Sequence, residues 1–161
     1  MNKTIEIALN KQIQKEIASA YLYLSIAAFC EGKTLRGFAH WFEVQAKEEM
    51  GHAMKIYKYI YSRGGQVELL ALDAPKAKLA SAMDALTSAF EHEQYITAEI
   101  HKLYKLTIEK EDVATQSFLK WFIDEQVEEE ESVTELIEKL KLIGERGGAF
   151  YMFDRELGKR E

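Results

Sequence analysis

The 161-residue chain is poor in residues that interrupt helices and in cysteine. It contains one proline, Pro75, and nine glycines, so few positions punctuate it, which favours long uninterrupted helices. Its one cysteine, Cys30, excludes an internal disulfide and any paired-cysteine site for zinc or thiol exchange. No run of five to eight Lys and Arg residues occurs, and the formal net charge is −6. Nucleic acid and anionic membranes are therefore poor candidates as partners.

Long apolar runs are missing as well. The most apolar stretch covers 11 residues, 20–30, whereas about 20 are needed to span a bilayer. The N-terminal segment MNKTIEIALNKQIQKE is charged throughout and lacks the apolar region of a signal peptide. These features and the single cysteine predict a cytoplasmic protein. With 47% hydrophobic residues, the chain has ample material for one core, and its length fits a single domain over residues 1–161.

Apolar periodicity predicts an all-α fold of four long helices and a short fifth one. Residues three and four apart share one helix face, and this spacing runs through four long segments, several of which end at glycines. Ser81 followed by Asp84 resembles a capping box at the start of the third segment. The expected helices cover residues 4–31, 35–63, 81–109, 113–143 and 149–157. The apolar face of the first one is expected to run through Ile13, Ile17, Ala20, Leu24, Ala27 and Ala28.

The lengths of the connections predict how these helices are arranged. Short links make the first and second helices, and the third and fourth, antiparallel hairpins. The second and third helices are instead joined by 16 residues, 65–80. Extended chain of that length spans on the order of 50 Å, more than the roughly 42 Å of a helix of about 28 residues. We therefore expect a four-helix bundle with one long crossover between its second and third helices.

Each expected long helix carries a glutamate near its middle, in line with its apolar stripe. A single glutamate in such a position is usually solvated, but four at one depth of a bundle are harder to explain, because a buried unpaired carboxylate costs several kcal/mol. Their charge of about −4 would be neutralised by two divalent ions. Oxygen ligands with one imidazole suit iron or manganese better than zinc. The inward residues are Glu16, Glu49, His52, Glu93, Gln126 and Glu129.

Around these residues the sequence resembles the prokaryotic non-haem ferritins, and the resemblance covers nearly the whole chain. The matching stretches are KEIASAYLYL, AKEEMGHAMK, EHEQYI and FLKWFIDEQVEEEE. Symmetric di-iron bundles of the ferritin-like type carry two Glu-x-x-His motifs. Here the fourth helix offers Gln126 and Glu129 instead, which speaks against bacterioferritin and is similar to the non-haem ferritins.

The resemblance implies iron storage and detoxification. In that interpretation the chain oxidises Fe(II) to Fe(III) at a di-iron ferroxidase centre inside one subunit, with O₂ or H₂O₂ as the oxidant. The product is stored as a ferric oxyhydroxide mineral in a hollow shell of twenty-four identical subunits. The apolar fifth helix, around Phe150 and Phe153, has a physical reason to pack against neighbouring subunits.

The resemblance also implies roles for individual residues. Glu16 and His52 would bind one iron. Glu93 and Glu129 would bind the second, and Glu49 would bridge the two. Gln126 would orient the oxidant, and two aromatic residues would supply an electron, although both are equally consistent with ordinary core packing. These two residues are Tyr23 and Trp121.

A third iron site facing the inner cavity is implied by a further set of acidic residues, which could equally form a solvated helix face. This set is Glu48, Glu125, Glu128 and Glu129. Met50 matches the haem-ligating methionine of bacterioferritins, but non-haem relatives also carry Met there, so no haem is expected. A zinc protease would need a histidine at Ile96, after His92 and Glu93. A metal-free interaction bundle would leave the inward carboxylates unexplained.

Overall fold

Five helices make up the secondary structure of the chain in a computed structural model that describes residues 1–161. There are no strands, which confirms the predicted all-α class. The predicted bounds differ from the observed ones by about two residues or fewer. None of the helices has an apolar stretch of the length that crossing a membrane requires. The helices are α1 (Lys3–Gly32), α2 (Arg36–Ser62), α3 (Ala82–Glu109), α4 (Val113–Ile143) and α5 (Gly147–Leu157).

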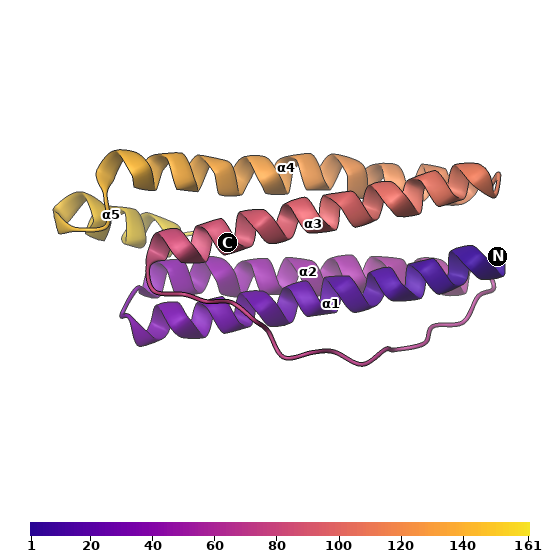
Figure 1. Cartoon of the computed structure of the whole chain (residues 1–161), viewed down its shortest axis with the longest axis horizontal. Coiled ribbons are helices and arrows are strands. Elements are labelled where there is room, and N and C mark those ends of the chain that lie inside the picture. Colours follow the sequence, from indigo (N-terminus) through magenta and orange to yellow (C-terminus); the bar gives the residue numbers. More distant parts are fainter.

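The four long helices form two antiparallel pairs, α1 with α2 and α3 with α4 (Figure 1). The segment between α2 and α3 runs along the whole bundle, as its length predicts, and α5 packs at the end where α4 stops (Figure 1). Asn10 fixes the start of this crossover to α1. Its Nδ2 donates to the carbonyl of Gln66 at 2.9 Å, and its Oδ1 accepts from the backbone N–H of Glu68 at 2.8 Å.

Side chains at the helix starts explain where the helices begin. The predicted capping box is present on α3, where Ser81 Oγ accepts from the Asp84 N–H at 3.0 Å and Asp84 Oδ2 accepts from the Ser81 N–H at 3.1 Å. Asp112 caps α4 by accepting from the Thr115 N–H at 3.0 Å. The N-cap residue of α2, Leu35, does not cap the helix with its side chain. Instead, Asp154 of α5 accepts a hydrogen bond from the Phe38 N–H at 3.0 Å.

The buried apolar side chains form two separate clusters along the bundle. One lies toward α5 and includes Tyr23, Phe42 and Val133. The other lies toward the opposite end and includes Ile13 and Ile56, together with further residues of α3 and α4. On every long helix the buried residues between the two clusters are polar. The core therefore consists of two apolar halves with a polar layer between them.

One detail of the predicted stripe on α1 is wrong. Its periodicity placed Leu24 and Ala28 inward, but both are exposed, Leu24 by 52%. The buried face passes instead through Tyr23, Ile26 and Cys30. This part of α1 is apolar on several sides, so its own sequence does not specify one face, and packing against α2 and α3 decides.

Candidate metal centre

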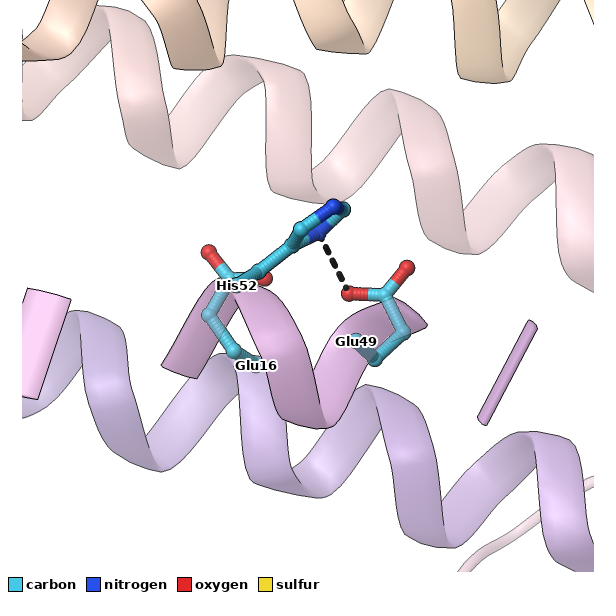
Figure 2. A group of neighbouring side chains, drawn as sticks. All are labelled: Glu16, Glu49 and His52. Atoms are coloured by element: carbon cyan, nitrogen blue, oxygen red, sulfur yellow. Dashed lines mark ion pairs between the residues drawn. The ribbon is translucent and has the colours of Figure 1, made fainter. Parts of the chain in front are cut away.

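Each of the four long helices contributes to the polar layer, and the residues of this layer are at most 6% exposed. The layer contains all six inward residues that the sequence predicts, together with Gln45. The predicted depth of these residues is therefore confirmed. Figure 2 shows three of them, Glu16 from α1 and Glu49 and His52 from α2.

The ligand atoms of Glu16, Glu49 and His52 lie within 4.8 Å of one another. Glu49 and His52 are three residues apart on one face of α2, and His52 Nδ1 is 3.3 Å from Glu49 Oε2 (Figure 2). Glu16 Oε2 and both carboxylate oxygens of Glu49 are buried without any hydrogen-bond partner. An unsatisfied buried oxygen costs about 1–3 kcal/mol. Three such oxygens beside an imidazole form a donor set that fits a divalent cation.

The imidazole of His52 links this group to a second one. Its ligand atoms, together with those of Glu125 and Glu129, also lie within 4.8 Å of one another, and His52 Nε2 is 3.6 Å from Glu125 Oε1. One ring nitrogen thus faces each group. Glu125 was expected in a separate cavity-facing set, and the structure places it beside His52.

Glu93 of α3 belongs to neither of these close groups and has partners on both oxygens. The Tyr23 hydroxyl donates to Oε1, and Gln126 Nε2 donates to Oε2 at 3.0 Å. These contacts place Tyr23 and Gln126 directly at the polar layer. Trp121 packs edge-on against the His52 ring, with ring centroids 5.4 Å apart. Lys55 Nζ lies 3.2 Å from the centroid of the Trp121 ring.

Two glutamines that the sequence analysis assigned no role orient the carboxylates. Gln12 Nε2 donates to Glu16 Oε1 at 2.7 Å, and Gln45 Nε2 donates to Glu129 Oε2 at 2.9 Å. Gln12 is four residues before Glu16 on α1, so helical spacing could have revealed it. An amide that holds one carboxylate oxygen fixes the orientation of the other.

Burial and mutual repulsion favour protonated carboxyl groups in the metal-free layer. Burial, and then the charge of Glu49, raises the pKa of Glu16 to about 8. Burial, and then the charge of Glu93, raises the pKa of Glu129 to about 7. Burial is also the main cause that raises the pKa of Glu93 and lifts the pKa of Glu49 well above its ordinary value. A bound cation would replace these protons.

Glu48 and Glu128 lie at the edge of this arrangement. Glu48, whose side chain is 42% exposed, forms an ion pair with Arg160, with 2.6 Å between Oε2 and Nη2. Glu128 is exposed on α4 and belongs to neither close group of ligand atoms. The structure therefore does not bring Glu48 and Glu128 together with Glu125 and Glu129 as one compact set.

The family model of the ferritin-like domain matches residues 6–143, which include the whole polar layer. The chain belongs to the ferritin family. It is 39% identical to the bacterial non-heme ferritin of Staphylococcus aureus (strain USA300) over 160 residues, which cover 99% of this chain and 96% of that protein. The non-heme ferritin of Staphylococcus saprophyticus has the same identity and the same coverage.

Solved structures of ferritins agree with this assignment. An engineered closed form of the Archaeoglobus fulgidus ferritin matches with a TM-score of 0.98 and 42% identity, over 100% of this chain and 98% of that one. The open-pore ferritin of the same archaeon matches with a TM-score of 0.97, at the same identity and coverage. Iron storage and Fe(II) oxidation, the functions of ferritins, are thus functions of this chain, with iron as the substrate.

Proposed function

We propose that the chain binds two Fe(II) ions per subunit within the polar layer and oxidises them together. The observation that carries this proposal is the set of three buried, partnerless carboxylate oxygens on Glu16 and Glu49, next to the imidazole of His52. A joint two-electron oxidation by O₂ or H₂O₂ avoids releasing a one-electron oxygen radical. Carboxylates are hard ligands that suit iron in this role.

The contacts support a division of roles. Glu16 and His52 would bind one ion, and Glu49, with both oxygens free, would bridge to the second. Glu93 and Glu129 would bind the second ion. A glutamine amide already holds one oxygen of each, and on Glu93 the ion would take the oxygen that now accepts from Tyr23. The protons that their raised pKa values retain would leave as iron binds.

Tyr23 and Gln126 are suited to assist the oxidation because both donate hydrogen bonds to Glu93. Gln126 would also orient the oxidant. Tyr23 and Trp121 border the layer on its Glu93 and His52 sides, where each could deliver an electron.

A third iron site is proposed next to the centre. The close group of His52, Glu125 and Glu129 shares Glu129 with the second ion, so oxidised iron could pass from one site to the other. Glu48 and Glu128 would complete this site after their side chains move. This transfer would carry iron toward the stored mineral.

The storage shell is proposed to contain twenty-four copies of this single domain, residues 1–161, and to work in the cytoplasm. Large apolar side chains at the α5 end of the bundle support burial between subunits. Leu142 is 87% exposed, Tyr151 62% and Met152 60% in the single chain. Contacts with neighbouring subunits would remove these side chains from water.

Aerobic addition of Fe(II) to the metal-free protein tests the proposed centre. The wild type should form ferric iron, followed by its absorbance, far faster than buffer alone. A Glu49→Ala/Glu93→Ala double variant should fall to the buffer rate, whereas Glu43→Ala, on the exposed side of α2, should retain the wild-type rate. If the double variant oxidised Fe(II) as fast as the wild type, the chemistry would lie elsewhere.

A further inference from the structure

The C-terminal segment folds back onto α2 and places Arg160 on Glu48. Arg160 Nη2 donates to Glu48 Oε2 at 2.6 Å, and the guanidinium carbon lies 4.7 Å from the centroid of the Trp41 ring. The backbone carbonyl of Arg160 is 2.7 Å from His40 Nε2, which donates to it. Contacts with three residues of α2 thus hold both the side chain and the backbone of Arg160.

The preceding helix fixes the position of this segment. Asp154 of α5 accepts from the N–H of Phe38 at 3.0 Å, and α5 approaches α2 so closely that a Cβ on Gly37 would lie 1.5 Å from the Asp154 carbonyl oxygen. A Cβ on Gly158 would lie 3.5 Å from the Cα of Gly37. Arg160 therefore extends from an anchored helix and reaches Glu48 at a defined place.

Glu48 belongs electrostatically to the metal centre although its side chain points away from the buried layer. It directly precedes Glu49 in the sequence. Burial, and then the charge of Glu93, are the main causes that raise the pKa of Glu49 and of Glu129, and the negative charge of Glu48 adds a smaller increase to both. The guanidinium on Glu48 is a permanent positive charge, because arginine does not lose its proton in proteins. It sits at the carboxylate that a metal ion would need.

We propose that Arg160 is a tethered cation that occupies Glu48 Oε2, so that a metal ion must displace the Arg160 side chain before this oxygen can act as a ligand. This proposal rests on the proposed function in one respect, the use of Glu48 as an iron ligand. The contact is suited to displacement because Glu48 is 42% and Arg160 26% exposed, and ion pairs in water are weak. Arg160 thus sets how readily the third iron site is completed.

Binding of Zn²⁺, a redox-inactive probe, to the assembled metal-free protein tests this proposal. Affinity and stoichiometry per subunit are measured by competition with a fluorescent chelator. The Zn²⁺ site that disappears in the Glu48→Gln variant is the Glu48-dependent site, and the Zn²⁺ binding that disappears in the Glu49→Gln variant belongs to the buried centre. Arg160→Gln should tighten the Glu48-dependent site about two- to fivefold, the range expected for releasing a partly exposed ion pair. The buried centre should bind with nearly unchanged affinity.

Three further variants make the result decisive. Arg155→Gln removes the same charge from an exposed residue of α5 and should leave the affinity as in the wild type. Arg160→Lys keeps the charge and should give an intermediate affinity. Arg160→Gln/Glu48→Gln should match Glu48→Gln alone. An Arg160→Gln variant that binds Zn²⁺ as the wild type does, or more weakly, overturns the proposal. Absence of saturable Zn²⁺ binding in the wild type would instead contradict the proposed metal centre itself.

Discussion

Replacing Glu49 by glutamine should stabilise the metal-free protein and remove most of its stabilisation by metal ions. Both oxygens of Glu49 are buried without a partner, and its pKa lies well above the ordinary value because of burial and of the charges on Glu93 and Glu129. Glutamine keeps the shape of the side chain and cannot ionise. The substitution therefore removes the cost of burying a charge while it also removes the proposed bridging ligand.

The sign and size of the effect follow from proton linkage. Because the pKa of Glu49 is higher in the folded than in the unfolded state, its contribution to stability is present at low pH and is lost as the pH rises through the folded-state value. Between its unfolded-state and its folded-state pKa, one such group lowers the free energy of unfolding by about 1.4 kcal/mol per pH unit. Between pH 6 and 8, Glu49→Gln should gain about 1–3 kcal/mol on the wild type, or about 2–12 °C in melting temperature.

Scanning calorimetry of the metal-free assembled protein at pH 6, 7 and 8, with and without Zn²⁺, measures both effects. Glu43→Gln, on the exposed side of α2, is the matched control and should follow the wild type at every pH. Zn²⁺ should raise the melting temperature of the wild type and of this control much more than that of Glu49→Gln. Parallel pH profiles for Glu49→Gln and the wild type would refute the reasoning, as would an undiminished Zn²⁺ effect.

Three other predictions follow from contacts elsewhere in the structure. Zn²⁺ binding at pH 7 should release protons and weaken as the pH falls, because the pKa of Glu16 is raised to about 8; calorimetry in buffers of different ionisation enthalpy counts the protons. Tyr23→Phe removes the hydroxyl that donates to Glu93. It should lower the free energy of unfolding by about 1–3 kcal/mol and slow Fe(II) oxidation in a stopped-flow assay. Gly37→Ala would place a Cβ 1.5 Å from the Asp154 carbonyl oxygen, so limited proteolysis should cut α5 much faster than in the wild type.

Local signals made most of the fold predictable. Ser81 and Asp84 form a capping box within four residues of chain, and the length of the crossover alone required it to run along the bundle. The face of α1 near Leu24 was not predictable in this way. Apolar residues surround that part of the helix, so only its contacts with α2 and α3 select the buried side.

The candidate centre was predictable where a charged residue interrupts an apolar stripe, as Glu16 and Glu49 do. Gln12 gave a weaker signal, because a neutral amide on a helix face does not demand a partner as a buried charge does. Arg160 gave none, since it meets Glu48 across 112 positions of sequence. Which ligand atoms come close together also depends on side-chain reach, and that is why Glu125 lies with His52.

The distribution of positive charge explains how the carboxylates of the layer can be held in place and still receive metal ions. Inside the layer, amides rather than ammonium or guanidinium groups orient the carboxylates. Gln12, Gln45 and Gln126 each hold one oxygen without supplying a charge that would compete with iron. A fixed cation there would satisfy the partnerless oxygens and remove the reason to bind metal. The guanidinium of Arg160 lies instead on half-exposed Glu48, where water weakens the ion pair and an arriving ion can replace it.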